Sequence, residues 1–312
     1  MSRLERLIEG CVAFKQALGF DFSGEAQRLR SHLESTDGGE LSPGSALACA
    51  CGGVGHPRSY QIQRYETVRR FSEFAHALDR NVSAPRPGLL GKTGGRVVPF
   101  IYSKEDIVIL MSSARSLKSP EGPRGESLAF LMGIMSCCGL RISEALGIED
   151  PDLDEAEGAL AVRNSKFGSS RTIALMPDVV DSIKRYQTLR NGIVGKPKAR
   201  RMIVVTGGRP LSRDSAEGML SEIRWTLLDR DDVFSGRMPR LHDARHSFAV
   251  ATILRWHEEG EDVNALIPYL SAYLGHRKLS DTYWYLTGVP DLLAVAAESF
   301  LSMGLGAGDG QN

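Results

Sequence analysis

The stretch from Leu241 to Leu286 constrains this chain more than any other, because it gathers chemically capable side chains at helical spacing. It begins LHDARHSF and ends YLSAYLGHRKLSDTYWYL. His242 and Arg245 are three residues apart, so on a helix both side chains lie on one face. An Arg presents a planar fork of donors that matches phosphate oxygens, and a Tyr can act as a nucleophile. Arg, His and Tyr without a metal-ligand cluster indicate covalent phosphoryl transfer on a phosphodiester.

The spacing within this stretch resembles that of the tyrosine recombinase (phage integrase) family, of the Xer or transposon type. The family pattern is His-x-x-Arg, then Leu-Gly-His, then a nucleophilic Tyr nine residues after that His. The one departure is Ala244, where the family usually has a larger apolar residue, and we interpret it as a packing change. In this sequence the pattern selects His242, Arg245, His276 and Tyr285.

Two upstream segments complete the resemblance. The segment GLRISEALGI matches the family's first catalytic Arg motif, with Arg141 and, one turn later, Glu144. As a surface pair, an Arg and a Glu at this spacing are common and weak, so the interpretation depends on the match. Lys166 lies in the turn SKFGSS between two predicted strands, where the family places a mobile catalytic Lys. The resemblance implies that Glu144 orients Arg141 and takes no part in the chemistry.

The resemblance also implies a reaction. Cleavage of a phosphodiester requires stabilisation of negative charge and a proton for the departing oxygen. Two arginines would hold the non-bridging oxygens and His276 would hydrogen-bond the phosphate. Lys166 would protonate the leaving 5′-oxygen, and His242 would assist proton transfer with Tyr285. The product is a 3′-phosphotyrosyl bond, which conserves energy, so neither ATP nor a metal ion nor another cofactor is implied.

Two tyrosines compete for the nucleophilic role. Tyr283 and Tyr285 flank Trp284, and side chains two positions apart point in different directions on a helix or a strand. The nine-residue spacing from His276 selects Tyr285. We expect Tyr283 and Trp284 to pack the segment against its domain.

The N-terminal region predicts a small helical domain over residues 1–80, which the resemblance implies is a core-binding (SAM-like) DNA-binding domain. Apolar residues recur at helical spacing over 4–18 and 59–78, and Ser23 is a plausible N-cap for a helix between them. The Gly- and Ser-rich stretch that precedes the 59–78 segment predicts a loop with one short helix. Residues 81–102 contain three Pro and predict a linker.

The remainder predicts a catalytic domain over residues 103–303, mainly helical with a small β-sheet, and a disordered tail over 304–312. Ser103 and Asp106 form a capping-box start to a helix, and ESLAFLMGIMSCC is apolar nearly all round, which is typical of a buried helix. Strands are predicted on either side of SKFGSS and in RMIVVTGG. Further helices are expected after Pro177, after Leu211, at HDARH, from Asp262 to Leu274 and from Pro290 to Met303.

Basic side chains of the first 102 residues are candidate DNA contacts, although a basic helix face is usually only a solvated one. GKT at 91–93 resembles the end of a phosphate-binding loop, but the Gly required five residues earlier is Arg86. We therefore interpret the linker cations as charges near DNA. The candidates are Arg64, Arg69 and Arg70 on the exposed face of the 59–78 helix, and Arg86, Lys92 and Arg96 in the linker.

The composition of the chain restricts the class of protein less than these motifs do. The 312 residues allow two domains, and the 42% hydrophobic content is typical of a soluble protein. Without a long apolar run, we expect a cytoplasmic, nucleoid-associated protein with no membrane partner. The 38 basic and 38 acidic side chains balance, so charge neither supports nor excludes DNA. Five irregularly spaced Cys argue against disulfides, and Cys49, Cys51 and His56 lack a fourth metal ligand.

The resemblance implies double-stranded DNA with inverted-repeat half-sites as the partner, a homotetramer on paired sites, and accessory proteins. The expected activity is site-specific recombination or integration. Three alternatives remain open at this point. They are a type IB topoisomerase-like enzyme, a catalytically silent DNA-binding relative, and a helical regulator that needs none of these residues.

Overall fold

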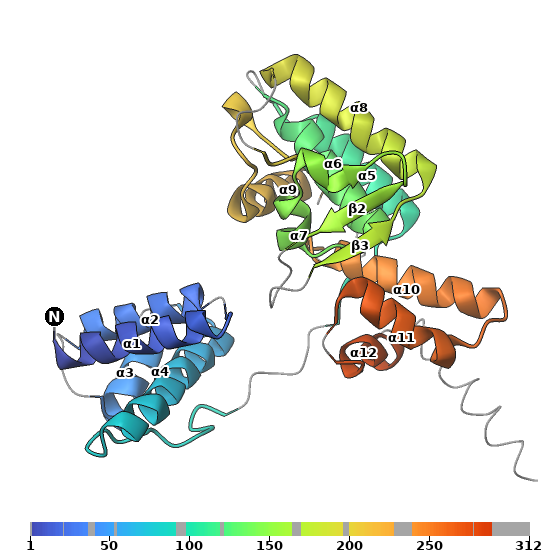
Figure 1. Ribbon diagram of the computed structural model, residues 1–312. Helices are drawn as coiled ribbons and strands as arrows, with labels where there is room; N and C mark the ends of the chain where they lie inside the picture. Colours follow the sequence, from blue (N-terminus) through green and yellow to red (C-terminus); the bar gives the residue numbers. More distant parts are fainter. Residues whose placement is uncertain are drawn as a thin grey trace, which may run out of the picture. The chain divides into compact units, whose positions relative to one another are not determined.

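The computed structural model describes most of the chain, which forms two compact units, Met1–Val97 and Val98–Asn312 (Figure 1). Among the helices it describes, none combines the length and the apolar character needed to cross a bilayer. The predicted helix at 290–303 and the tail at 304–312 lie outside the described residues. The described residues are 2–20, 22–36, 41–52, 55–91, 98–118, 122–163, 170–195, 200–227, 239–276 and 278–288.

The first unit consists of helices packed around one apolar core. A capping box between Ser2 and Glu5 begins the first helix, and the third helix begins at Pro43, behind the N-cap Ser42. The short helix expected inside the Gly- and Ser-rich stretch is therefore present. Ser23 is the first residue of its helix and not the N-cap, a position that Phe22 occupies. The helices are α1 (Arg3–Ala17), α2 (Ser23–Ser35), α3 (Pro43–Cys51) and α4 (Arg58–Leu78).

The second unit places a buried helix at its centre. This helix, α6, packs against α5, α8 and α10, and nine of its fifteen residues are buried, as its apolar sequence predicts. The capping box of Ser103 and Asp106 at the start of α5 is confirmed. The helices described in this unit are α5 (Lys104–Arg115), α6 (Arg124–Cys138), α7 (Ile142–Gly147), α8 (Pro177–Val194), α9 (Arg213–Leu227), α10 (Asp243–Glu258), α11 (Val263–Leu274) and α12 (Ser280–Gly288), with 3₁₀ turns at Asp150–Asp152 and Thr206–Gly208.

A small antiparallel sheet lies beside these helices, with strands in the order β1 (Leu153–Asp154), β2 (Ala159–Val162) and β3 (Arg171–Ala174). Leu160 pairs with Ile173, and both are buried. Val162 pairs with Arg171 where the two strands enter the turn that connects them. The two predicted strands are thus present, and the short β1 adds a third. The turn itself, 164–169, lies outside the described residues.

The prediction of a β-strand in RMIVVTGG is wrong. Single bridges pair Glu149 with Arg201 and Val204 with Pro210, and the segment then turns through Thr206–Gly208. The pairing partner changes from Glu149 to Pro210 along the segment, so neither bridge extends into a ladder of paired residues. The residues are apolar because Met202, Ile203 and Val204 are buried, and burial alone does not distinguish a strand from an irregular core segment.

The predicted linker, 81–102, is packed at several of its described positions. Leu90 belongs to the core of the first unit, and the Tyr65 hydroxyl donates a hydrogen bond to the Arg86 carbonyl at 2.7 Å. Tyr102 belongs to the core of the second unit, and its backbone N–H donates to the Ser247 hydroxyl at 2.7 Å. The residues between Gly91 and Val98 lie outside the described residues, so a linker over these positions stays a prediction.

Candidate active site

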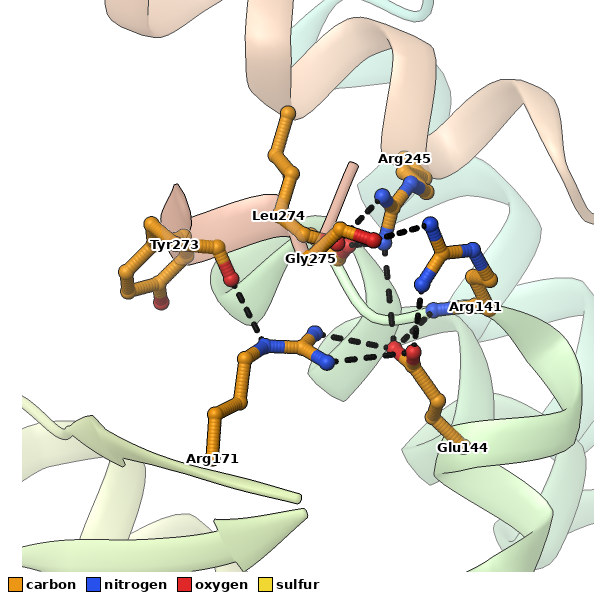
Figure 2. A network of polar contacts seen from close by, with 8 residues as sticks. Arg141, Glu144, Arg171, Arg245, Tyr273, Leu274 and Gly275 are labelled. Carbon is orange, nitrogen blue, oxygen red and sulfur yellow. Dashed lines mark hydrogen bonds and ion pairs between the residues drawn. The ribbon is translucent and has the colours of Figure 1, made fainter. Parts of the chain in front are cut away.

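Glu144 is the centre of a buried network of arginines (Figure 2). Its side chain is 1% exposed. It accepts hydrogen bonds from the backbone N–H of Arg141 at 3.0 Å and from Arg141 Nη1 at 2.7 Å. Arg171 donates to both carboxylate oxygens, at 3.1 and 2.9 Å, and Arg245 Nη1 lies 3.8 Å away. Three guanidinium groups therefore converge on a single carboxylate.

This environment keeps Glu144 charged. Burial acts to raise its pKa, but hydrogen bonds from Arg171 and Arg141 outweigh burial and lower the pKa to about 2. Because α7 begins directly after Arg141, the same carboxylate caps the helix and holds the Arg141 side chain. This geometry is what an orienting residue requires. Since three positive charges face one negative charge, the network retains an excess of positive charge.

The two arginines of the motif are anchored on backbone carbonyl groups (Figure 2). Arg245, on α10, is 1% exposed and donates to the carbonyls of Gly139 and Leu274 at 2.7 and 2.6 Å. Arg141 Nη2 donates to the carbonyl of Gly275 at 2.7 Å. Burial and the charge of Arg141 lower the pKa of Arg245 to about 10, so it stays protonated at neutral pH. Leu274 and Gly275 are adjacent, which brings both guanidinium groups to one place.

Two of the residues around these hydrogen bonds are glycines, Gly139 and Gly275, whose carbonyl groups accept from Arg245 and Arg141. Gly139 ends α6 with φ +58°, and a Cβ there would lie 2.5 Å from the ring of Phe248. Gly275 ends α11 with φ +64°, and a Cβ there would lie 3.0 Å from Arg171 Nη1. Left-handed backbone at both positions favours Gly. The Gly in the Leu-Gly-His motif is thus a geometric requirement of the anchor.

Three histidines line the site in neutral form. His242 directly precedes α10, and its ring packs edge-on against that of His246, one turn later, with 4.6 Å between centroids. His276 Nδ1 lies 2.7 Å from the Thr282 hydroxyl. Burial, assisted by nearby positive charge, lowers the pKa of His242 and His276 to about 4 and that of His246 to about 3.

Tyr285 faces this cluster from α12. Its side chain is 2% exposed, its ring stacks on that of His276 with 6.3 Å between centroids, and its hydroxyl lies 3.1 Å from His246 Nδ1. Tyr283 is 39% exposed, so the expectation that it packs the segment against the domain is wrong. Trp284 does pack there, against the apolar cluster of α10 and α11.

The structure therefore brings five of the six predicted catalytic residues and Glu144 into one unit, whereas Lys166 lies outside the described residues. It also adds two residues that the sequence analysis missed. Arg171 begins β3 and joins the sheet to α11 through Nε, which donates to the Tyr273 carbonyl at 2.7 Å. His246 is the final residue of HDARH, so its sequence signal was its position beside Arg245 and one turn after His242.

The proposed basic face of α4 is only partly exposed. Arg64 donates to the Gly52 carbonyl and to Cys49 Sγ, each at 3.2 Å. The side chain of Arg69 is 13% exposed and pairs with Glu66 and Glu73 at 2.8 and 2.5 Å, so its placement on an exposed face is wrong. Acids one turn before and one turn after capture its guanidinium group. Arg70 and Arg86 are exposed, and Lys92 and Arg96 lie outside the described residues.

Within the described ranges, no group of three or more His, Cys, Asp or Glu side chains is arranged to hold a metal ion. Cys49 is buried against α4, whereas Cys51 is exposed.

The second unit should lose stability as the pH falls below about 6.5. The pKa values of the three histidines lie well below the ordinary 6.5, so between these values the unfolded chain binds protons that the folded site does not. Stability rises with pH wherever the unfolded state binds more protons, so acid removes it. Glu144 adds to this effect from pH 4.5 down to about 2, since its folded pKa is lowered.

Urea denaturation over a pH series measures this effect, and the His246→Asn variant should lose less stability between about pH 6.5 and pH 4 than the wild type. A free energy of unfolding that is constant over that interval would contradict the neutral, buried state of the histidines.

Comparison with known proteins defines the class. The fold matches that of tyrosine recombinase catalytic domains: a structure of the Tn1549 transposon integrase in complex with transposon right-end DNA aligns with a TM-score of 0.65 and 17% identity, covering 96% of this chain and 99% of the other. A structure of the lambda integrase bound to DNA aligns with a TM-score of 0.58 and 16% identity, covering 89% and 92%.

The family model described as the phage integrase family matches residues 102–288. The chain belongs to the phage integrase family, and its enzyme class is that of the tyrosine-type site-specific recombinases. Two similar proteins of Sinorhizobium fredii, provisionally named integrase/recombinases y4rB and y4rE, are 31% and 29% identical, each over 95% of this chain and 96% of its own length.

Proposed function

We propose that this enzyme cleaves and rejoins DNA strands through a 3′-phosphotyrosyl intermediate on Tyr285. The observation that carries the proposal is the convergence of Arg141 and Arg245 on the adjacent carbonyls of Gly275 and Leu274, beside a helix that presents Tyr285. Arginine forks bind phosphate oxygens in pairs. The excess positive charge around Glu144 provides the electrostatic stabilisation that a phosphodiester transition state needs.

The proposed reaction exchanges one phosphodiester bond for another. The Tyr285 oxygen attacks phosphorus and loses its proton to a histidine of the site, an oxygen–phosphorus bond forms, and the bond from phosphorus to the 5′-oxygen breaks. Lys166 gives a proton to the departing 5′-oxygen, Arg141 and Arg245 hold the non-bridging oxygens, and His276 hydrogen-bonds the phosphate. Attack by a 5′-hydroxyl on the phosphotyrosine reverses the step and joins strands, so the energy of the bond is conserved throughout.

Trapping of the covalent intermediate tests the proposal. A duplex built from inverted repeats beside the gene, nicked close to the cleavage site, loses a short fragment after cleavage and cannot be rejoined. Wild-type enzyme should then remain attached to the DNA on a denaturing gel. Binding without attachment would indicate a silent DNA-binding relative, and relaxation of supercoiled DNA without strand exchange would indicate a topoisomerase-like enzyme.

The partner that we propose is duplex DNA with inverted-repeat half-sites, contacted by both units, with four protomers assembled on paired sites. The exposed cations Arg70 and Arg86 of the first unit support contacts to the phosphate backbone. Sizing of the complexes at increasing salt measures both parts of the proposal, because phosphate contacts weaken steeply with salt. A salt-insensitive complex, or paired sites that never hold more than two protomers, would contradict it.

A further inference from the structure

The residue in contact with the Tyr285 hydroxyl is His246. Its Nδ1 atom lies 3.1 Å from the hydroxyl oxygen, within hydrogen-bonding distance. The two side chains come from α10 and α12, and the imidazole edge meets the tyrosine ring with 5.5 Å between centroids. His246 thus touches the atom that, under the proposed function, becomes bonded to phosphorus.

The imidazole is held in this place by its neighbours. Its ring packs against those of His242 and Trp284, with centroids 4.6 and 5.9 Å away. Its own backbone follows Arg245, whose side chain is anchored on two carbonyls. A ring packed against two aromatic neighbours presents Nδ1 toward Tyr285, which is the preorganisation that proton transfer requires.

His246 is neutral in the free site, so its ring is able to accept a proton. Burial, together with the charges of neighbouring cationic groups, keeps the pKa of His246 near 3, so the free ring is neutral and has one nitrogen without a hydrogen. A tyrosine hydroxyl retains its proton at neutral pH. In the tautomer with the ring hydrogen on Nε2, Nδ1 accepts a hydrogen bond from the hydroxyl, and this is the tautomer that proton transfer needs. A bound phosphodiester brings negative charge, which raises the pKa of the imidazole.

We propose that His246 is a further catalytic residue, which accepts the Tyr285 proton as the tyrosine oxygen attacks phosphorus. The proposal rests on the proposed function. The proton moves from the hydroxyl to Nδ1 while the oxygen–phosphorus bond forms and the bond to the 5′-oxygen breaks. In rejoining, His246 returns the proton to the tyrosine oxygen. His242, which the sequence pattern suggested for this transfer, packs against the His246 ring and supports its orientation.

The test measures the rate of covalent attachment to the nicked duplex by the full-length chain. His246→Asn keeps an oxygen that can accept a hydrogen bond near the place of Nδ1, but it cannot hold a proton. We expect attachment to slow by about 10²-fold or more, the usual range for loss of a general base, with unchanged DNA binding. His257→Asn, in the last turn of the same helix, is the matched control and should attach at the wild-type rate.

Two further measurements separate proton transfer from a structural role. Imidazole added to His246→Gly should restore part of the rate, because it can enter the space left by the side chain and accept the proton. The rate of His246→Asn should also rise with pH, as the phenolate becomes available without a base. A slow variant with normal DNA binding, no imidazole rescue and no pH dependence would overturn the proposal.

Faster attachment by His246→Asn would also overturn it, because His246 would then restrain Tyr285 and not activate it. If neither the wild type nor the control forms an adduct, the proposed function itself fails. That outcome is distinct, since a failure of the His246 proposal alone leaves the wild-type adduct intact.

Discussion

Replacement of Tyr285 by Phe should abolish the covalent adduct while DNA binding persists. The phenyl ring keeps its stacking on His276 and its contact with Trp284, and the lost hydrogen bond to His246 costs about 1 kcal/mol of stability. The fold should therefore survive. The nucleophilic oxygen is gone, so no phosphotyrosyl bond can form, and the loss should be complete to the limit of detection on a denaturing gel.

Tyr283→Phe is the matched control, because it removes the same atom two positions away from a side chain that is 39% exposed. It should form the adduct at close to the wild-type level. An adduct in Tyr285→Phe together with none in Tyr283→Phe would transfer the nucleophilic role to Tyr283. It would also refute the inference from the buried position of Tyr285.

Replacement of Arg141 by Lys should separate cleavage from binding. An ammonium group retains the charge, but it cannot reproduce the fork that bonds Glu144 at 2.7 Å and the Gly275 carbonyl at 2.7 Å together. Cleavage should fall by about 10²- to 10³-fold, the usual cost of one lost donor to transition-state charge. Glu144 keeps both of its hydrogen bonds from Arg171, so the unit should remain folded and should bind DNA.

The control for this variant is Arg213→Lys, an exposed residue paired with Glu217 at the start of α9. It tests whether exchange of Arg for Lys affects the enzyme in general, and cleavage should be unchanged. Rates of adduct formation and binding affinities, measured on the same nicked duplex, give both quantities. Normal cleavage by Arg141→Lys would show that Arg141 does not contact the phosphate in the transition state.

Local signals in the sequence predicted the helices well where a cap or an apolar period defined them. The Ser103–Asp106 capping box is an interaction between neighbours, so the sequence contains all of it. The resemblance to the phage integrase family is confirmed by the family match. It directed attention to Glu144 and Arg245 although they are 101 positions apart in the numbering, a distance that no periodicity spans.

Interactions between distant segments were not predictable in the same way. Arg171 is isolated among small polar residues in the sequence, and its importance comes from a carboxylate on α7 and a carbonyl on α11. The exposure of Arg69 was misjudged because helix periodicity places a side chain on a face but does not reveal that acids on both sides enclose it. RMIVVTGG was misassigned because an apolar run reports burial and not pairing.

The anchoring of both arginines on backbone carbonyls has an evolutionary consequence. Every residue type carries a carbonyl group, so exchange of the Leu274 side chain leaves the anchor of Arg245 in place as long as the helix ends at the same point. At Gly139 and Gly275 the left-handed backbone restricts this freedom to residues that tolerate it. Descendants of such an enzyme can therefore diverge widely in side chains around the centre while they inherit its geometry through the main chain. We expect the two glycines to change more slowly than the apolar residues beside them.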